Sequence, residues 1–407
     1  MESAAFRIAA LALFLFLGGC GRIVPAAPPV SMPAAPAPAP AATPTPARPA
    51  TAALTGVTAG PSIASLGLGS SDAASALASF RESCPRLLAR NDASGLTRKE
   101  DWQAPCSAAR GWDRAATEFF ASHFETARVG DGSAFATGYY EPEIRASRVP
   151  APGYAVPIYR LPPDLVRAWP ADMPESERTG RPPLGRYDAQ GQFVPYFERA
   201  EIVAGALAGK GLEIAWAADE IEFFFLQVQG SGLLRLPDGS LVRIGYAGQN
   251  GRDYTGIGSV MRQRGLIGDG PGQYPGSMQG IVRYLREHPE DGRALMNENR
   301  SWVFFRELTT DGPLGALEIP VRRGASVAAD PAYVPLGAPV WLDLDRAEAD
   351  GLWIAQDTGG AIKGPNRFDT FWGNGGDAAE VAGGMSGRGA ALLFLPRGTL
   401  ARLQSQR

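Results

Sequence analysis

The chain is 407 residues long, with 45% apolar and 20% charged side chains. This length is enough for two domains, or for one domain that carries a large insertion. Its 39 basic and 42 acidic side chains nearly cancel, which argues against nucleic acid or an anionic surface as the partner.

Residues 1–20 predict a secretory signal peptide, because one arginine precedes an apolar run that is too short to span a membrane comfortably. The ending Leu17-Gly18-Gly19-Cys20 resembles the lipobox of bacterial lipoproteins, which implies that Cys20 is lipidated and becomes the mature N-terminus. Residue 21 is Gly rather than Asp, and in the Gram-negative sorting pattern this favours the outer membrane. We therefore expect a lipid anchor at the periplasmic face of the outer membrane. The alternative is an ordinary signal peptide with an incidental cysteine.

The next segment is rich in Pro, Ala and Thr, most clearly in PAAPPVSMPAAPAPAPAATPTPARPA. Such a composition cannot bury a core and favours extended polyproline conformations. We predict a tether over residues 21–74, as an anchored protein needs if it is to reach a distant polymer. A recognition segment for a proline-binding partner is the alternative.

Two cysteines remain besides Cys20. Cys84 and Cys106 are 22 residues apart, and in an exported chain a disulfide between them would close a small, stabilising loop. The alternative is two buried free thiols. Neither cysteine has the context of a catalytic thiol, because the two histidines, His123 and His288, sit in no recognisable nucleophile motif.

The first folded elements are predicted as one helix and one strand. Residues 113–127 have the pattern of an amphipathic helix, with apolar side chains at 116, 119, 120 and 124, and residues 134–141 have that of a strand. His123 lies beside the apolar stripe. It is expected to be packed or at the surface, since no second histidine or cysteine is spaced to bind a metal with it.

Residues 222–228 are rich in aromatic and β-branched side chains and predict a strand, which the turn PDGS at 237–240 joins to LVRIGY as a hairpin. Strand alternation would place Phe223, Phe225, Gln227 and Gln229 on one face, with the amides beside Gly230. Amides in that position suit the hydroxyl and acetamido groups of a polysaccharide.

The remaining elements are also short. Helices are predicted at 278–287, after a Ser277 cap, and at 292–298. From Pro320 onward the strands VWLDL, LWIAQ and AALLFL alternate with loops rich in Gly and Asp, and no repeat of fixed period occurs. The pattern is mainly β, which favours barrels over a doubly wound sheet.

Motifs for metal, thiol and serine chemistry are missing from the sequence, which contains no HExxH, no CxxC pair and no GxSxG. Lys363 in GGAIKG suggests a phosphate loop, but Gly364-Pro365 follows it instead of Ser or Thr. We therefore expect carboxylate chemistry that uses no metal and no cofactor.

Three aspartates lie at the edges of short apolar strands: Asp330 opens DPAYVPLG, Asp357 ends LWIAQD, and Asp369 follows NRF. A single aspartate in such a place usually bonds its own turn. Three of them surround a loop with glycines at 359, 360, 364, 373, 375 and 376. This arrangement predicts a groove in which a sugar polymer can approach the backbone closely.

Polysaccharide cleavage requires an acid that stays protonated near neutral pH until it protonates the leaving oxygen. Asp369 is the candidate, because desolvation by Phe368, Phe371 and Trp372 would keep its carboxyl protonated. Asp357 is either the second carboxylate of a hydrolase or a supporting group, and spacing alone leaves both open.

Five separated motifs resemble the membrane-bound lytic murein transglycosylase A family over about residues 75–396. They are TGYYEPE at 137–143, QVQGSG at 227–232, YAGQNGRDYTGIG at 246–258, NRSWVFF at 299–305 and DTGGAIKGPNRFDTFWG at 357–373. The C-terminal part is similar to the three-aspartate (3D) module of that family, with Asp330, Asp357 and Asp369 at its signature aspartates.

The resemblance implies a mainly β fold with a few short helices. A double-psi β-barrel domain would be formed by residues 75–142 and 306–407, and a second, mostly β domain, 143–305, would be inserted between them. The glycan would lie in a groove between the two. We expect the groove to be lined by Thr137, Tyr139, Tyr140, Gln229, Gly230, Ser231, Asp330, Gly359, Gly360 and Lys363.

The implied enzyme is a lytic exotransglycosylase of the polysaccharide lyase type. Asp369, at the position of the family's sole catalytic acid, would protonate the oxygen between N-acetylmuramic acid and N-acetylglucosamine. It would then take the proton of the C6 hydroxyl as a 1,6-anhydro ring closes, while Asp357 helps to stabilise the positive ring. The implied partners are peptidoglycan strands and, through the lipid anchor, the membrane. Nucleic acid is not among them, and the sequence identifies no protein partner.

The residues leave two other functions open. One is a peptidoglycan hydrolase in which Asp369 and Asp357 act as paired carboxylates. The other is a non-catalytic lipoprotein that binds cell-wall polysaccharide.

Overall fold

The computed structural model describes residues 50–406. The predicted signal peptide, the lipid anchor at Cys20 and the first part of the tether lie outside these residues. Across the described range, no helix combines the length and apolarity that a membrane crossing requires.

The larger sheet of the described chain is built from two distant chain segments, and its eight strands follow the order β1-β2-β17-β14-β15-β13-β16-β3. They are β1 (Val57–Ala59), β2 (Phe124–Val129), β3 (Ser133–Glu141), β13 (Ser326–Ala329), β14 (Pro339–Leu344), β15 (Gly351–Asp357), β16 (Arg367–Asn374) and β17 (Ser386–Pro396). Strand β3 pairs with β17 as well as with β16, so the ladder returns to β17. The prediction of a mainly β fold with some helices is confirmed. The double-psi form stays a prediction.

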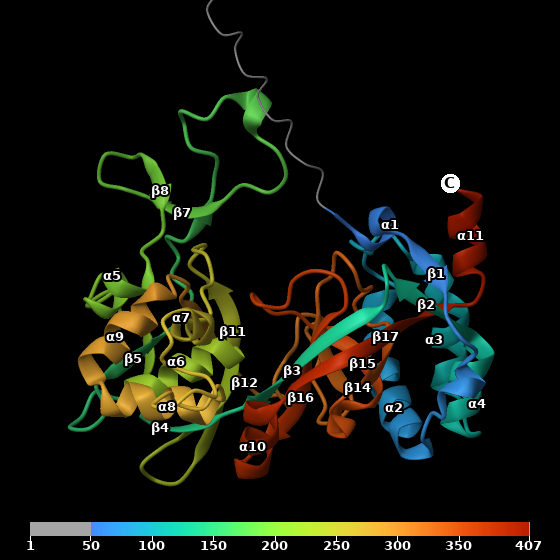
Figure 1. Cartoon of the computed structure of the whole chain (residues 1–407). Helices are drawn as coiled ribbons and strands as arrows, with labels where there is room; N and C mark the ends of the chain where they lie inside the picture. Colours follow the sequence, from blue (N-terminus) through green and yellow to red (C-terminus); the bar gives the residue numbers. More distant parts are fainter. Residues whose placement is uncertain (1–49, 407) are drawn as a thin grey trace, which may run out of the picture. The chain divides into compact units, whose positions relative to one another are not determined.

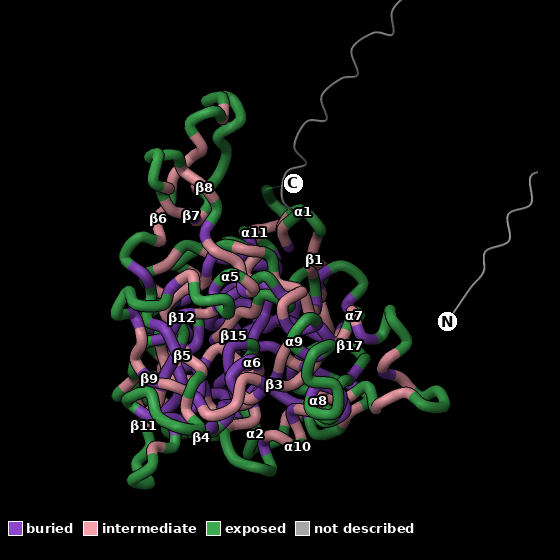
Figure 2. Tube along the Cα trace, turned by 90° about the vertical axis from the view of Figure 1, so that its left-hand side faces the viewer, coloured by how far each residue is buried: buried purple, intermediate pink, exposed green. Residues whose placement is uncertain are grey.

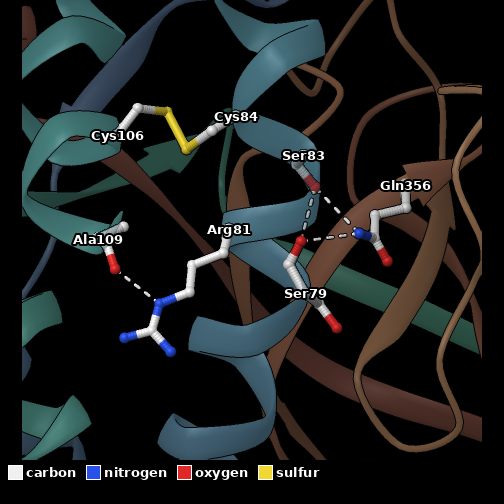
Figure 3. The surroundings of a disulfide bond; sticks show 7 residues. All are labelled: Ser79, Arg81, Ser83, Cys84, Cys106, Ala109 and Gln356. Atoms are coloured by element: carbon white, nitrogen blue, oxygen red, sulfur yellow. Dashed lines mark hydrogen bonds between the residues drawn. A yellow bond between two sulfur atoms is a disulfide. The ribbon is translucent and has the colours of Figure 1, made fainter. Parts of the chain in front are cut away.

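Helices cover this sheet. They are α1 (Ala52–Thr55), α2 (Ser70–Leu87), α3 (Gln103–Arg110), α4 (Ala116–His123), α10 (Gly376–Gly384) and α11 (Thr399–Ser405). In Figure 1, α2, α3 and α4 lie together beside the sheet. Aromatic side chains fill the space between these helices and the strands, with Phe80, Phe119 and Phe124 fully buried against one another. A disulfide joins Cys84 of α2 to Cys106 of α3, with Cα atoms 5.5 Å apart (Figure 3).

A second sheet contains six strands within the described residues, in the order β12-β11-β10-β4-β9-β5. They are β4 (Glu143–Ser147), β5 (Val156–Tyr159), β9 (Glu213–Ala217), β10 (Ser231–Arg235), β11 (Leu241–Gln249) and β12 (Val303–Leu308). The accompanying helices are α5 (Arg199–Val203), α6 (Glu220–Gln229), α7 (Ile257–Gln263), α8 (Met278–Glu287) and α9 (Pro289–Glu298). A small sheet of β6 (Val166–Arg167), β7 (Leu184–Tyr187) and β8 (Phe193–Pro195) carries mostly exposed and half-buried residues (Figure 2).

The strand predicted at 222–228 is wrong, because these residues form helix α6. The carboxylate of Asp219 caps the helix by accepting hydrogen bonds from the N–H groups of Ile221 and Glu222. Gly230, with φ of 82°, ends it. The PDGS turn is correct, but the first strand of its hairpin is β10, which pairs with β11. A short apolar run has no clear period, so its end signals decide between helix and strand.

The helix predicted at 113–127 is too long. Helix α4 ends at His123, and Phe124 begins β2, whose residues pair with β17. Pairing with a strand 270 residues farther along the chain outweighs the local helical pattern here. The strand predicted at 134–141 and both helices predicted between 278 and 298 are confirmed, including the Ser277 cap, whose Oγ accepts from the N–H of Gly280.

The predicted tether extends too far. Within residues 50–74, β1 pairs with β2, and the side chains of Ala52 and Ile63 are buried. Apolar side chains such as these can be part of a core once neighbouring strands supply contacts. The expected boundary at residue 306 lies within β12, which belongs to the second sheet, and the division into domains stays a prediction.

Candidate active site

Neighbouring strands of the larger sheet bring two of the three predicted aspartates together. Ala328 on β13 is in register with Asp357 on β15 and with Asp369 on β16. Two strand spacings therefore separate the two aspartate Cα atoms, which corresponds to about 10 Å. On its other side, Asp369 is in register with Thr137 of β3. Asp369 thus lies within β16 rather than at a strand edge as expected.

Asp369 is half-buried and accepts one side-chain hydrogen bond. The Oγ1 of Thr137 donates to Asp369 Oδ1 at 2.5 Å, and Nη2 of Arg367 donates to Thr137 Oγ1 at 2.9 Å. Because a guanidinium only donates, the hydroxyl proton of Thr137 must point at Asp369. Among the described residues, no hydrogen bond is made to Asp369 Oδ2. This oxygen is therefore free to carry and transfer a proton.

Burial raises the pKa of Asp369 to about 6. The hydrogen bond from Thr137 and the charge of Arg367 act in the opposite direction, while the nearby carboxylate of Asp357 raises the pKa further. A carboxyl with this pKa is partly protonated close to neutral pH. It can therefore act as an acid in one step and as a base in the next.

Asp357 is held by donors on both of its oxygens. Oδ1 accepts from the N–H groups of Ala316, at 2.9 Å, and Thr358, at 2.8 Å. Oδ2 accepts from the hydroxyl of Tyr139 at 3.1 Å. Burial raises the pKa of Asp357 to about 6 despite these three hydrogen bonds, which lower it. Burial and the charges of the two carboxylates also raise the pKa of Tyr139, which keeps it protonated as a donor.

Asp330 is not part of this carboxylate pair. Its Oδ1 accepts from the N–H of Ala332 at 3.0 Å, and its Oδ2 accepts from the N–H of Gly364 at 2.8 Å. Asp330 is buried, and its carboxylate connects the Gly-rich loop, at Gly364, to the turn that Asp330 itself begins. Of the loop residues expected in the groove, Gly360 and Lys363 are exposed, while Gly359 is half-buried.

The aromatic residues that surround Asp369 in the sequence divide between the two faces of β16. Phe368 is fully buried in the core. Phe371, two residues from Asp369 and therefore on its face, packs against the ring of Tyr139 with centroids 5.0 Å apart. Trp372 donates from Nε1 to the hydroxyl of Thr370 at 2.9 Å. Desolvation of Asp369 by all three rings was expected, and only Phe371 shares its face of the strand.

The amides predicted as neighbours point in different directions, because residues two apart in a helix lie on different sides. Gln229, the last residue of α6, accepts with Oε1 from the N–H of Tyr140 at 3.1 Å. Gln227 is buried and accepts from Nη1 of Arg199 at 2.6 Å. Ser231 is buried in β10. Gln229 and Tyr140 therefore belong to one site, whereas Gln227 belongs to the core.

A cavity of about 210 Å³ lies beside these residues. It is lined by Gly138, Tyr140, Phe224, Phe225, Val228, Gln229, Tyr254, Gly256, Ile257, Gly258, Met278, Ile281, Ala382 and Gly383. Strand alternation places Gly138 and Tyr140 on the face of β3 opposite Thr137 and Tyr139. Gly138 and Tyr140 therefore border the cavity, whereas Thr137 and Tyr139 bind the two aspartates.

Sequence reasoning missed Tyr254, which borders this cavity. Burial raises the pKa of Tyr254, and the charge of Asp369 raises it further, so its hydroxyl lies within electrostatic reach of that carboxyl. The motif YAGQNGRDYTGIG contains this tyrosine among several glycines and was the signal that could have found it. Within residues 50–406, no three His, Cys, Asp or Glu side chains are grouped so that they could hold a metal ion.

Models of two protein families match the chain. One, described as the MltA specific insert domain, matches residues 135–306, and the other, described as the 3D domain, matches residues 325–395. The membrane-bound lytic murein transglycosylase A of Vibrio cholerae is 32% identical over 263 residues, which are 62% of this chain and 62% of that protein. The chain therefore covers less than two thirds of the length of this relative.

Solved structures extend the similarity over most of the chain. MltA from Neisseria gonorrhoeae is 33% identical, with a TM-score of 0.66, and the match covers 86% of this chain and 96% of that one. MltA from Escherichia coli with bound chitohexaose is 27% identical, with a TM-score of 0.57 and coverage of 80% and 90%. The two domain matches and the near-complete structural match show that this chain belongs to the membrane-bound lytic murein transglycosylase A family.

Proposed function

We propose that this protein is a lytic transglycosylase that cleaves the β-1,4 bond between N-acetylmuramic acid and N-acetylglucosamine in peptidoglycan and leaves a 1,6-anhydromuramoyl product. The names of its relatives support the reaction, and the relative with bound chitohexaose supports a saccharide ligand. The observation that carries the proposal is the Asp369 carboxyl, which has a pKa of about 6 and a free Oδ2.

In the proposed reaction, protonated Asp369 donates its proton to the glycosidic oxygen as the bond between that oxygen and C1 of the muramoyl ring breaks. The resulting carboxylate then accepts the proton of the C6 hydroxyl while O6 forms a bond to C1. The proton lost in the first step is regained in the second. The reaction therefore needs no water and no second base.

Thr137 and Arg367 orient Asp369 for this role. The hydroxyl of Thr137 holds Oδ1, so the proton is carried on Oδ2. Asp357 is assigned a supporting role because three donors already hold its oxygens. Its negative charge can stabilise the positive ring that develops at C1. A hydrolase would need Asp357 as a base or nucleophile, and these hydrogen bonds oppose that use.

The rest of the site is assigned to glycan binding. Tyr139, Tyr140, Gln229, Gly230, Ser231, Gly359, Gly360 and Lys363 are proposed to line or shape the groove, with Asp330 supporting its loop. The double-psi barrel, the inserted domain as the second wall, and the lipid anchor at Cys20 on the outer membrane are parts of the same proposal. The returning ladder of the larger sheet is consistent with the first of these.

Mass spectrometry of peptidoglycan digested by the purified protein tests the reaction. We expect muramoyl products with the 1,6-anhydro ring. Products heavier by one water, with reducing ends, would establish the hydrolase instead, and binding without any cleavage would establish a polysaccharide-binding protein.

Substitution of single aspartates tests the assignment of roles. Asp369→Asn should lower the rate by about 10³-fold, because it removes the only proton donor and acceptor of the reaction. Asp357→Asn should keep more activity, since it removes charge stabilisation alone. The control is Asp377→Asn, which removes an exposed carboxylate paired with Arg323 and should leave the rate unchanged. If Asp369→Asn cleaves as fast as this control, Asp369 is not the acid.

A further inference from the structure

A buried polar network lies directly behind Asp357. Its members are the side chains of Ser83 of α2, Ser326 of β13 and Gln356 of β15, together with the backbone carbonyl of Ser79 of α2, and none of these four residues is more than 1% exposed. Buried polar groups away from water are costly unless each one has a partner. Their presence next to the carboxylate pair therefore calls for a role.

Figure 3 shows the hydrogen bonds that Gln356 forms with Ser79 and Ser83, and the chemistry of the groups fixes their directions. Ser83 Oγ donates to the carbonyl of Ser79 at 2.9 Å, so it must accept from Gln356 Nε2, at 3.0 Å. The same Nε2 donates to the carbonyl of Ser79 at 2.9 Å. Ser326 Oγ accepts from the N–H of Arg322 at 2.6 Å and donates to Gln356 Oε1. Both donors and the acceptor of the Gln356 amide are thus used.

Gln356 also occupies an irregular position in its strand. Val327 of β13 pairs with Ala355 of β15, and the next residue, Ala328, pairs with Asp357. Gln356 is therefore the extra residue of a β-bulge and has no partner on β13 in the ladder. Bulges redirect the side chains that follow them. Here the residue that follows is Asp357, and the buried network replaces the missing ladder contact.

The backbone of Gln356 is linked to the donors of Asp357. The carbonyl of Gln356 accepts from the N–H of Leu317 at 3.2 Å, while the preceding N–H, of Ala316, donates to Asp357 Oδ1. A Cβ at Gly315 would lie only 2.5 Å from the carbonyl oxygen of Gln356. A shift of Gln356 would therefore displace both the Asp357 backbone and the loop that holds its carboxylate.

Helix α2 provides a fixed base for this network. Cys84, bonded to Cys106, directly follows Ser83. Glu82 forms two hydrogen bonds with Arg322, at 2.7 and 3.1 Å, close to Ser326. A disulfide and an ion pair thus flank the two serines that hold the Gln356 amide.

We propose that Gln356 is a positioning residue for the reaction: held by Ser79, Ser83 and Ser326, it sets the bulge that aims Asp357 toward Asp369 and toward the ring charge. The proposal rests on the proposed function. Gln356 does not touch the substrate, so its loss should lower kcat and leave KM close to its normal value. It should also change the pH dependence of kcat, because Asp357 affects the protonation of Asp369.

The test compares Gln356→Leu with Arg81→Leu in the full chain. Arg81 also lies on α2, but it points toward α3, where it donates a hydrogen bond of 2.6 Å to the carbonyl of Ala109 (Figure 3). It donates a second one, of 2.8 Å, to the carbonyl of Trp112. The melting temperatures of both variants are measured first, and kcat, KM and the pH profile are then measured well below them. We expect Gln356→Leu to lower kcat by about 10- to 100-fold with a changed pH profile. Arg81→Leu should lower only the melting temperature.

Two results would overturn the proposal: an unchanged kcat and pH profile in Gln356→Leu, or an equal loss of kcat in Arg81→Leu. If Gln356→Leu does not fold, Ser326→Ala takes its place, since it removes a single hydroxyl, and the same two criteria apply. Failure of the proposed function is a separate result, in which the wild-type protein releases no anhydro product.

Discussion

The carboxyl groups of Asp369 and Asp357 differ in the hydrogen bonds that they accept. Burial raises the pKa values of Asp369 and Asp357 alike, to about 6. The two differ in their hydrogen bonds: within residues 50–406, Asp357 accepts three, whereas Asp369 accepts one from Thr137. The oxygen of Asp369 without a hydrogen bond, more than the pKa, therefore supports the proposal that Asp369 is the proton donor.

Thr137→Val should move the alkaline limb of the profile of kcat against pH to higher pH. The hydroxyl of Thr137 lowers the pKa of Asp369, so its removal raises that pKa further above its usual value and keeps the acid protonated to higher pH. Thr137→Ser keeps the hydroxyl and serves as the control. An unchanged alkaline limb in Thr137→Val would show that this hydrogen bond does not tune the acid.

The raised pKa of Asp369 also predicts that its ionised carboxylate destabilises the folded protein near neutral pH. Folding raises the pKa of Asp369 from 3.8 to about 6, so between these pH values the folded state binds a proton more tightly than the unfolded chain. The contribution of Asp369 to the free energy of unfolding is therefore most favourable at low pH, and this contribution is lost as the pH rises through this window. Asp369→Asn removes the charge and should raise the free energy of unfolding at pH 7.5 by about 1–2 kcal/mol.

Urea denaturation at pH 7.5 and at pH 4 checks this prediction, because the gain should vanish at the lower pH, where the wild-type carboxyl is protonated. Asp377→Asn is the control, since its exposed carboxylate is paired with Arg323 and its pKa is lowered by that pair. A gain that is equal at both pH values would point to a cause other than the charge of Asp369.

Among the elements, helix α6 links the core of the second sheet to the site. Its buried face includes Phe223 and Leu226, while its last residue, Gln229, accepts from the backbone of Tyr140. The position of Gln229 therefore depends on where the helix begins and ends. Its first turn is held by Asp219, which also accepts from Nη1 of Arg286 at 2.9 Å.

Asp219→Ala should lower the free energy of unfolding by about 1 kcal/mol, because two backbone N–H groups at the start of α6 lose their acceptor. Chemical denaturation measures the change. Asp219→Asn keeps an oxygen that can accept from these N–H groups and should retain most of the stability. Equal losses in the two variants would assign the effect to the ion pair with Arg286 rather than to the cap.

At the scale of the whole described chain, the two large sheets are joined where β3 leads into β4. Glu141, the last residue of β3, is 1% exposed and accepts two hydrogen bonds from Arg243 of β11, at 2.8 and 3.3 Å. Arg243 also donates to the carbonyl of Thr310, in the segment that returns to the first sheet. This ion pair therefore stabilises both places where the chain passes between the sheets, at Glu141 and at Thr310.

Glu141→Ala should destabilise the protein by about 2–3 kcal/mol, since it leaves the guanidinium of Arg243 without its counter-charge. It should also raise KM for peptidoglycan, because the proposed groove needs both sheets in register. Thermal unfolding and digestion kinetics measure the two effects. Glu143→Ala breaks the nearby exposed pair with Arg235 and should change neither the stability nor KM measurably, because exposed ion pairs contribute little. Equal effects of the two variants would contradict a special role for the buried pair.

The sequence by itself determined the mainly β class, the Ser277 cap of α8, the PDGS turn and the Gly-rich run that contains Asp357 and Asp369. These features depend on neighbouring residues, so a local pattern is enough to find them. The sequence did not determine the secondary structure of short apolar runs such as the one that forms α6, because such a run fits a helix as well as a strand.

Only the tertiary structure decided which aspartate keeps an oxygen without a hydrogen bond among the described residues. Thr137 and Tyr139, which bind Asp369 and Asp357, are 232 and 218 residues away from them in the chain. Burial and hydrogen bonding set the pKa and the free oxygens of a carboxyl, and both arise from parts of the chain that meet only on folding. The same holds for the bulge at Gln356, whose partners come from α2 and β13.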